Sequence, residues 1–246
     1  MEPTDAAAIW RLTYQDAGEA PGQRRGVPMP PLEQELPSAA QLIPLPEPAQ
    51  AAPAPLDFFQ LVNARRSHRM FRPEPLSQSE LSFLLWCTQG VQRLEPGVRT
   101  MRTVPSAGAR HAFETLLLVN EVEMLNPGMY RYAASAHALV ELQYSPERIE
   151  RMVDGFRNVN LLVQSAVVFL WAAVVGRMTW KFGARGHRYL LLDAGHICQN
   201  LYLACGSIGC GTCAIGSFDD EEVNAALGFD GAEQMLVYAA SVGKLP

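Results

Sequence analysis

Lys181 is the residue of this sequence whose surroundings best suit acid–base chemistry. It stands between a tryptophan and a phenylalanine in the stretch "TWKFGARGHR" at 179–188. Aromatic neighbours would remove water from its ammonium group, and Arg177, Arg185 and Arg188 would disfavour its positive charge. A lysine held in this way can act as a base near neutral pH. If the arginines point to solvent, Lys181 is an ordinary surface lysine.

A second candidate site is the stretch "ARRSHRMF" at 64–71. It places three arginines around Ser67, namely Arg65, Arg66 and Arg69. Planar guanidinium groups and a hydroxyl at this density suit an anion, and a phosphate in particular. A basic turn that faces solvent would have the same composition, so the sequence leaves both interpretations open.

The stretch "TVPSAGARH" at 103–111 predicts a turn directly before a strand. The turn is built from small or rigid residues, namely Pro105, Ser106, Ala107 and Gly108. Small residues let the backbone approach a flat ligand closely, and exposed amides can bond to ring heteroatoms. An ordinary surface loop remains the alternative.

The stretch "CGSIGCGTCAIGSFDD" at 205–220 resembles two known motifs without completing either. Its glycines match a dinucleotide-binding fingerprint by letter, but the stretch follows a helical pattern and enters no helix immediately. Cys205, Cys210 and Cys213 have the spacing of three iron–sulfur ligands, yet no cysteine follows Cys213. We therefore expect no metal here, and we expect these residues to pack in the core.

Three polar residues, Asp193, His196 and Asn200, lie three and four residues apart in a long helical pattern. They therefore share one face of that helix and are candidates for catalysis. A buried stripe of mutually hydrogen-bonded side chains is the better hypothesis. Gly195 costs the helix about 1 kcal/mol against alanine, which suggests that a second subunit or another close neighbour packs there.

The remaining patterns predict the elements that position these residues. Helices are expected at 56–64, 76–90, 145–156, 187–205 and 219–228, and strands at 113–120, 128–144, 166–175 and 234–243, with a hairpin break at 133–136. Ser77 followed by Glu80 predicts a capping box. Because helices and strands do not alternate regularly, the expected fold class is α+β.

The first 55 residues differ from the rest in composition. They hold eleven of the 18 prolines, and proline lacks the amide that a backbone ladder needs. We predict an arm at 1–55 and one globular domain at 56–246. The arm is either a disordered tail or an extended segment that packs along the domain.

Composition narrows the classes of partner and location. A formal net charge of -5 gives no reason to expect nucleic acid. The N-terminus lacks the basic and apolar regions of a secretory signal, and the most apolar stretch, 166–175, is about half the length of a membrane-spanning helix. Five cysteines, an odd number, do not predict a disulfide framework. We expect a cytoplasmic protein with free thiols and no membrane partner.

Five motifs, taken in order, resemble the SagB-type dehydrogenases of the nitroreductase superfamily. They are "RRSHRMF", "RTVPSAGARHAFE", "GMYRY", "KFGARGHRYLLLDAGHICQNLYLA" and "IGSFDDEEVNAALGFDGAEQMLVYAASVG", and together they span about residues 56–243. The resemblance implies an α+β fold with a central, mostly antiparallel sheet flanked by helices. It also implies a homodimer with FMN at the subunit interface. Several members of that family oxidise thiazoline or oxazoline rings in ribosomally made peptides.

The resemblance also implies which residues contact FMN. The phosphate and the ribityl or pyrimidine side of FMN would be contacted by Arg65, Arg66, Ser67 and Arg69. Lys244 would be added to the phosphate site. Those approaching the ring from the other subunit would be Pro105, Ser106, Ala107 and Gly108. Those whose backbone faces the flavin N5 would be Gly216 or Ser217.

Lys181 falls where azoline-oxidising members carry a Lys-Tyr pair, which by resemblance removes the ring proton as hydride passes to FMN. In this sequence Phe182 keeps the aromatic ring and loses the hydroxyl. If the tyrosine accepted the proton, its loss would slow the reaction on the order of a hundredfold, although Lys181 alone could still serve as base.

Three functional hypotheses follow. The first is an FMN-dependent dehydrogenase that acts on a modified peptide or a similar ring substrate, with Lys181 as the base. The second is a nitroreductase or quinone reductase that uses NAD(P)H. Because the nicotinamide donates hydride directly, this enzyme needs no catalytic base, and a phenylalanine at position 182 would not slow it. The third is a non-catalytic scaffold that keeps the fold, but a scaffold has no use for a phosphate site.

Overall fold

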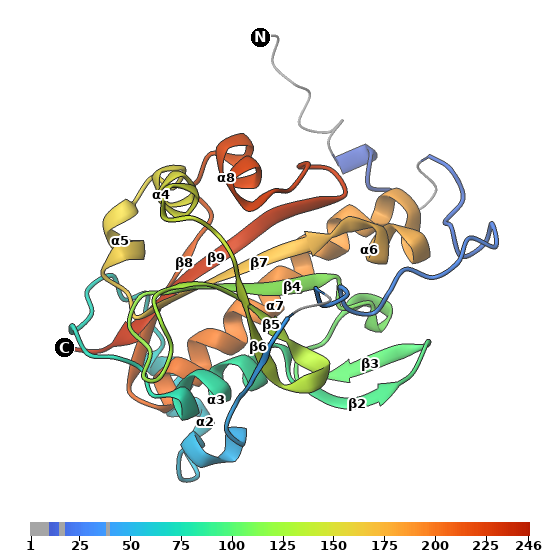
Figure 1. The fold of residues 1–246 in the computed structure, drawn as a ribbon. Helices are drawn as coiled ribbons and strands as arrows, with labels where there is room; N and C mark the ends of the chain where they lie inside the picture. The colour runs from blue at the N-terminus through green and yellow to red at the C-terminus, as the bar shows by residue number, and fades with distance from the viewer. Residues whose placement is uncertain (1–9, 15–17, 38–39) are drawn as a thin grey trace.

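The structure, a computed structural model, describes residues 10–14, 18–37 and 40–246 and is built around one antiparallel sheet (Figure 1). Its seven strands run in the order β1-β6-β5-β4-β7-β9-β8. They are β1 (Leu42–Pro44), β4 (Phe113–Val119), β5 (Gly128–Ala133), β6 (Ala138–Leu142), β7 (Val167–Val174), β8 (Cys210–Ile215) and β9 (Gln234–Lys244). A separate hairpin pairs β2 (Val91–Glu95) with β3 (Arg99–Arg102).

Helices cover both faces of the sheet, as Figure 1 shows. They are α2 (Phe58–Ala64), α3 (Gln78–Gln89), α4 (Pro146–Asp154), α5 (Val159–Val163), α6 (Val175–Phe182), α7 (Gly186–Ser207) and α8 (Asp220–Leu227). Short 3-10 turns lie at Pro48–Ala51, Ala107–Ala109, Ala134–Ala136 and Gly183–Arg185. The α+β class with a central antiparallel sheet is therefore confirmed.

The central strands β4 and β7 separate two hydrophobic cores. Both strands are buried on both faces, because successive side chains point to opposite sides of the sheet. Leu117 of β4 packs into the core shared with α3 and α7, whereas Leu116 packs into the core shared with α4, α5 and α8. The strands predicted at 113–120 and at 166–175, the most apolar stretch, are thus confirmed as β4 and β7.

Local signals in the sequence fixed several element boundaries. Ser77 and Glu80 form the predicted capping box at the start of α3, with hydrogen bonds in both directions. The Ser145 side chain caps α4. The hairpin of β5 and β6 breaks at Ala134–Ala136, inside the predicted interval.

Several elements were not expected from the sequence, among them β8, the β2–β3 hairpin and α6. The stretch 210–215 is strand β8 at the edge of the sheet, although its glycines and cysteines carried no strand pattern. Residues 91–102 form the β2–β3 hairpin, and 175–182 form α6 directly after β7. β8 takes its conformation from pairing with β9, a distant segment, whereas the β2–β3 hairpin is a local pairing whose pattern the sequence did not show.

The described part of the N-terminal arm packs along the body. β1 pairs with β6 at the edge of the sheet, and the Leu45 amide donates to the His137 carbonyl over 3.2 Å. Figure 1 shows the arm passing from α6 across the sheet to β1. For the described residues the extended, packed alternative therefore holds over the disordered tail.

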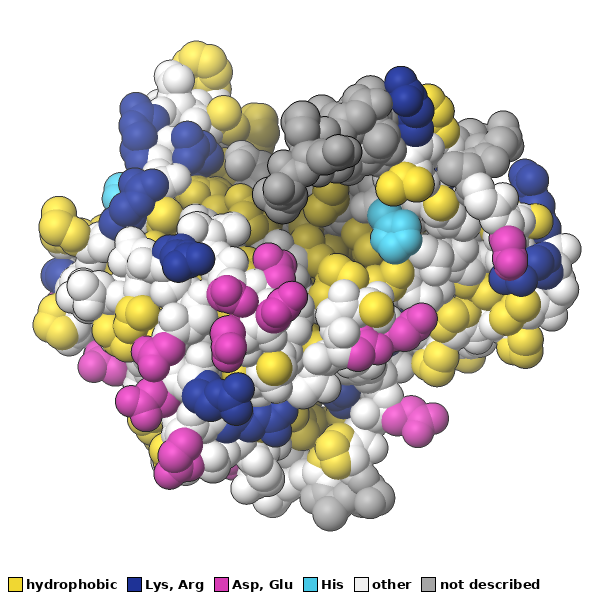
Figure 2. Space-filling model, turned by 90° about the horizontal axis from the view of Figure 1, so that it is seen from above, with side chains coloured by type: hydrophobic (Ala, Val, Ile, Leu, Met, Phe, Trp, Pro, Cys, Tyr) yellow, Lys and Arg dark blue, Asp and Glu magenta, His cyan; other side chains and the backbone are white. Residues whose placement is uncertain are grey.

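One face of the molecule combines acidic and apolar side chains. Seen from above, over α4 and α8, it shows acidic side chains gathered beside a hollow with apolar side chains in its floor (Figure 2). The sequence places four acids in a row at 219–222, where α8 begins, and all four are exposed. Acids at a helix start are favourable because they face the positive end of the helix dipole.

None of the helices in the described part of the chain has the length and apolar character of a membrane span.

Candidate functional site

Lys181 lies against the 105–111 loop, which the sequence had not connected to it. It sits in the last turn of α6, and its Nζ donates to the Gly108 carbonyl over 3.3 Å. Nζ also lies 5.7 Å from the centroid of the Phe182 ring. A Cβ on Gly108 would come within 2.8 Å of Nζ, and the Gly108 φ is +60°. Only glycine fits this position without strain, because it lacks a Cβ.

The backbone of this loop is held in an unusual conformation. Ala109 and His111, like Gly108, have positive φ angles, of 53° and 42°. Such angles are costly for residues with a Cβ and persist only where surrounding contacts enforce them. Here the Ser106 hydroxyl accepts from the His111 amide over 2.9 Å, and Asp193 Oδ1 accepts from the Ala107 amide over 3.2 Å.

Asp193 of α7 is thus the anchor of the loop. Its carboxylate is buried, and burial raises its pKa, although hydrogen bonds from Ser106 and Ala107 oppose the shift. Asp193 Oδ2 has no hydrogen-bond partner among the described residues. The sequence predicted only that Asp193 lies on a polar face of the helix. It gave no signal that Asp193 binds this loop.

The three polar side chains on one face of α7 do not form the predicted network of mutual hydrogen bonds. His196 lies 4.0 Å from Asp193, but its side chain is half exposed. Asn200 turns to other segments and donates to the carbonyls of Cys87 and Thr103, over 2.9 and 3.5 Å. The three side chains share a helix face yet bind different neighbours, so they form no common network.

The arginines expected around Lys181 have partners of their own. Arg177 is buried and pairs with Glu114 over 2.6 Å. Arg188 donates to the Thr13 hydroxyl over 2.8 Å, and the Arg185 guanidinium lies 5.7 Å from the Tyr189 ring centroid. Their charges are therefore directed at groups other than Lys181.

The candidate anion site is built around Tyr202, which sequence reasoning missed. The Ser67 Oγ lies 2.8 Å from the Tyr202 Oη, and the Arg65 guanidinium lies 5.2 Å from the Tyr202 ring centroid. The same Oη accepts from the Ala214 amide of β8 over 2.9 Å. Tyr202 therefore ties the 65–69 segment to the strand that leads to 216–217.

The arginines of this segment differ in their availability. Arg66 folds back and donates to the carbonyls of Asn63 and Arg65, each over 2.8 Å. Arg65 and Arg69 have no ion-pair partner within the described ranges, and Arg69 is exposed. Two uncommitted guanidinium groups beside a hydroxyl fit an anionic ligand.

The 65–72 segment runs close along the edge of the sheet. The His68 amide donates to the Thr212 carbonyl of β8 over 3.0 Å. A Cβ on Gly211 would come within 2.9 Å of the His68 Cβ. Gly211, which the dinucleotide fingerprint matched only by letter, therefore admits this neighbouring segment.

The remaining candidates occupy different surroundings. Gly216 and Ser217 are exposed, and the Ser217 carbonyl accepts from the Arg157 amide over 3.1 Å. Lys244 forms a hydrogen-bonded ion pair with Glu80. Burial would raise the pKa of Glu80, but the bonds from Lys244 and Ser77 outweigh it and hold the pKa below its usual value. A phosphate role for Lys244 would therefore require this pair to open.

The two candidate regions contact different turns of one helix, α7. Asp193 anchors the loop next to Lys181, and Tyr202 holds the Arg65–Ser67 segment. Nine residues separate them on α7, a rise of about 13 Å. α7 therefore contacts both the loop beside Lys181 and the candidate anion site.

The cysteines show no sign of a shared chemical role. All five are free. Burial raises the pKa of Cys87 to about 11 and that of Cys198 to about 12, which leaves both as unreactive thiols. No group of three or more metal-ligating side chains occurs in the part of the chain that the structure describes.

Comparisons with known proteins agree with this architecture. A protein of Methanocaldococcus jannaschii, named as a candidate nitroreductase, is 33% identical over 163 residues, which cover 66% of this chain and 80% of that protein. The solved structure of a candidate nitroreductase from Anabaena variabilis is 27% identical with a TM-score of 0.61, covering 76% of this chain. This chain spans only 38% of the length of the Anabaena protein.

Two further solved structures share the fold at lower identity. A chain of the Escherichia coli microcin synthetase McbBCD complex, solved with truncated pro-MccB17 bound, gives a TM-score of 0.60 at 20% identity, covering 78% of this chain and 75% of that one. A candidate nitroreductase from Desulfovibrio desulfuricans, solved in complex with FMN, gives 0.55 at 16%, covering 77% and 87%. The family model described as "Nitroreductase family" matches residues 62–244. This chain belongs to the nitroreductase family.

Proposed function

We propose that this chain is an FMN-dependent oxidoreductase of the SagB-type class, which transfers hydride from an azoline-like or other small or peptide-borne substrate to FMN. One observation carries the proposal: Lys181 Nζ contacts the Gly108 carbonyl. The resemblance assigns that loop to the flavin ring and Lys181 to the proton. Two segments with these expected roles thus meet in one place, although 73 residues separate them.

The side chains present fit FMN. Arg65, Ser67 and Arg69 would hold the phosphate, because they combine two uncommitted guanidinium groups with a hydroxyl that Tyr202 orients. From the other subunit of the homodimer, Pro105, Ser106, Ala107 and Gly108 would line the ring, with Gly216 or Ser217 near its N5. When bound, FMN supplies the acceptor for two electrons. Arg66 and Lys244 would take part only after leaving their present partners.

Lys181 would move the proton. As a neutral amine it has a lone pair for the proton that leaves the substrate carbon, and an N–H that can stay bonded to the Gly108 carbonyl. That bond limits the lone pair to two directions about Nζ. The Phe182 ring packs edge-on against Tyr189, with centroids 4.8 Å apart, and keeps water from one side of the amine.

A second candidate function is a nitroreductase or quinone reductase that takes electrons from NAD(P)H. It is favoured by Phe182, which offers no hydroxyl beside Lys181. With a nicotinamide as donor no proton needs to be removed from carbon, so this function would not depend on Lys181.

The similar solved structures support the class of substrate and cofactor. One of them is a microcin synthetase complex with truncated pro-MccB17 bound, and another holds FMN. Exposed apolar side chains on α2 and α7 suit a second copy of this chain. The proposal therefore includes a homodimer. It also keeps the expectations drawn from the sequence: a cytoplasmic protein with an arm at 1–55, a domain at 56–246 and no nucleic-acid or membrane partner.

The first experiment is the visible absorption spectrum of the purified protein, with the released chromophore identified. A yellow protein that releases FMN supports the proposal. Anaerobic NADPH and NADH are then added separately. Resistance of the flavin to both favours the dehydrogenase, whereas rapid bleaching by either favours the reductase. A colourless protein that takes up no added FMN would contradict both functions.

The role of Lys181 is tested by Lys181→Ala and Lys181→Arg. Arginine keeps the charge and cannot act as a base, since its guanidinium does not deprotonate in proteins. We expect both variants to keep bound FMN and to lose at least about a hundredfold in dehydrogenase turnover. Turnover equal to the wild type in Lys181→Ala would remove Lys181 from the mechanism.

A further inference from the structure

The N-terminal arm contacts the residue next to Lys181. The indole Nε1 of Trp180 donates to the Val27 carbonyl over 2.7 Å. The Gln23 amide donates to the Trp180 carbonyl over 2.8 Å. A Cβ on Gly22 would come within 3.1 Å of the Trp180 ring, so the arm fits tightly here. The end of α6 is therefore bound to the arm through both backbone and side chain.

The arm also contacts the loop that lies on Lys181. Arg110, two residues after Gly108, points its Nη1 at the Met29 Sδ over 2.9 Å. Its guanidinium lies 5.4 Å from the Trp180 ring centroid, a favourable cation–π arrangement. Met29 and Val27 are two residues apart, so one short stretch of arm holds both sides of the Lys181–Gly108 contact.

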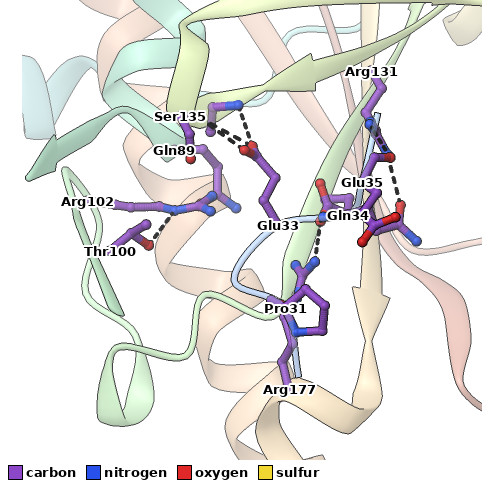
Figure 3. Close-up of polar contacts among 12 residues, drawn as sticks. Pro31, Glu33, Gln34, Glu35, Gln89, Thr100, Arg102, Arg131, Ser135 and Arg177 are labelled. Carbon is purple, nitrogen blue, oxygen red and sulfur yellow. Dashed lines mark hydrogen bonds and ion pairs between the residues drawn. The ribbon is translucent and has the colours of Figure 1, made fainter. Parts of the chain in front are cut away.

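A third contact fixes the helix one turn earlier. Arg177 of α6 donates through Nε to the Pro31 carbonyl over 2.7 Å, and through Nη2 to Glu114 of β4 over 2.6 Å. The Gln34 amide of the arm donates to the same Glu114 carboxylate over 2.8 Å. Figure 3 shows Arg177 pointing at this stretch of the arm. The arm thus completes the coordination of a buried ion pair.

The next arm residues anchor this stretch on the body. The Glu33 carboxylate accepts from the amides of Ala134 and Ser135, and Arg131 Nη2 donates to the Glu35 carbonyl over 3.0 Å (Figure 3). The Arg131 side chain is buried. Both acceptors of the Arg131 guanidinium, Gln34 Oε1 and the Glu35 carbonyl, belong to the arm, so it would lose them without the arm. The contacts therefore favour an arm that stays folded onto the domain.

From these contacts we infer that the N-terminal arm is a clamp of the candidate active site. By binding Trp180 and Arg177 of α6 together with Arg110 of the loop, it fixes the position of Lys181 Nζ against Gly108. Trp180, Arg110 and Arg177 are positioning residues, because each acts on the site through its contact with the arm. The importance of that position for turnover rests on the proposed function, whereas the clamp itself does not.

The clamp is tested with Trp180→Phe in the full chain, which removes the indole donor to Val27 and keeps an aromatic ring. The matched control is Trp86→Phe in α3, at a similarly half-buried position. Its ring packs edge-on against His137, with centroids 5.6 Å apart, and does not contact the arm stretch at 22–29. Two quantities are measured: hydrogen exchange of the amides at 107–111, and kcat and KM with the flavin content fixed.

Loss of one such hydrogen bond corresponds to about a three- to tenfold change in an equilibrium. We expect the loop amides to exchange faster by about that factor in Trp180→Phe, with kcat lowered and KM and flavin content unchanged. Trp86→Phe is expected to match the wild type in both. Equal exchange in the two variants would overturn the clamp, even if kcat fell in Trp180→Phe.

The outcomes also separate the clamp from the proposed function. Faster loop exchange in Trp180→Phe, together with full turnover in Lys181→Ala, would support the clamp and overturn the role of Lys181. Unchanged exchange with lost turnover in Lys181→Ala would overturn the clamp and leave the proposed function standing.

Discussion

At the scale of single residues, His111 shows how the candidate site depends on its surroundings. It is buried at the end of the 105–111 loop with a φ of +42°. Burial lowers its pKa from 6.5 to about 3, and the charges of Arg102 and Arg110 add to the shift. The ring is therefore neutral in the folded protein near neutral pH, while the same ring in the unfolded chain gains a proton below about pH 6.5.

His111 should make the protein less stable in acid. Because the unfolded chain binds the proton more tightly, the free energy of unfolding falls as pH drops from about 6.5 toward 3. His111→Asn removes this titration, and asparagine tolerates a positive φ. We expect the loss of stability between pH 7 and pH 4.5 to be smaller in the variant, measured by urea unfolding at each pH. His187→Asn, at an exposed position, is the control. A loss equal to that of the wild type in His111→Asn would contradict the assignment.

At the scale of elements, the 65–72 segment depends on its contacts with α7 and β8. Tyr202 of α7 orients Ser67, and β8 accepts the His68 amide. A backbone held on both sides can present guanidinium groups at fixed positions. Such fixed positions support the proposed anion site over the solvated basic turn, the alternative that the sequence left open.

Arg65→Ala combined with Ser67→Ala should weaken flavin binding. The change removes one guanidinium and one hydroxyl, each expected to bond to the phosphate, where a bond to a charged group contributes about 1.5–3 kcal/mol. We expect the apparent Kd for FMN to rise at least about tenfold, measured by fluorescence titration of apoprotein. Arg93→Ala, in the β2–β3 hairpin, controls for lost positive charge. Unchanged affinity in the double variant would refute the phosphate site.

At the scale of the whole molecule, the exposed apolar side chains of α2 and α7 call for a partner surface. Phe58 and Phe59 of α2 are 69% and 73% exposed, and Leu191 and Leu192 of α7 are 62% and 53% exposed. Gly195 of α7 is exposed with nothing within 4 Å of a Cβ added there. Exposed apolar surface of this kind marks an interaction site.

Phe58→Ser with Phe59→Ser should weaken self-association. Serine removes the apolar area that a second copy would bury, at roughly 25 cal/mol per Å². We expect the wild type to sediment as a dimer and the variant to shift toward monomer at micromolar concentration, measured by analytical ultracentrifugation. Met124→Ser is the control, since Met124 is 90% exposed outside these helices. A variant that sediments like the wild type would argue against α2 as part of the interface.

Much of the fold could be predicted because its signals are local. Apolar periodicity located β4, β7, β9 and α7, and the Ser77–Glu80 pair located the start of α3. β8 escaped because a strand of glycines and cysteines takes its conformation from its neighbour β9. The roles of the candidate FMN residues and the SagB-type substrate remain predictions, since they rest on the resemblance.

By itself, the sequence determined the α+β class, the main helices and strands, and the residue types that suit a base and an anion site. Only the tertiary structure decided which of them meet. In the folded chain Lys181 contacts Gly108, and the Ser67 hydroxyl bonds to Tyr202. Lys244 pairs with Glu80, and the proline-rich arm packs against α6. The physical reason is that secondary structure follows from interactions over a few residues, whereas these contacts join segments tens of residues apart. Such contacts form only when the whole chain is packed.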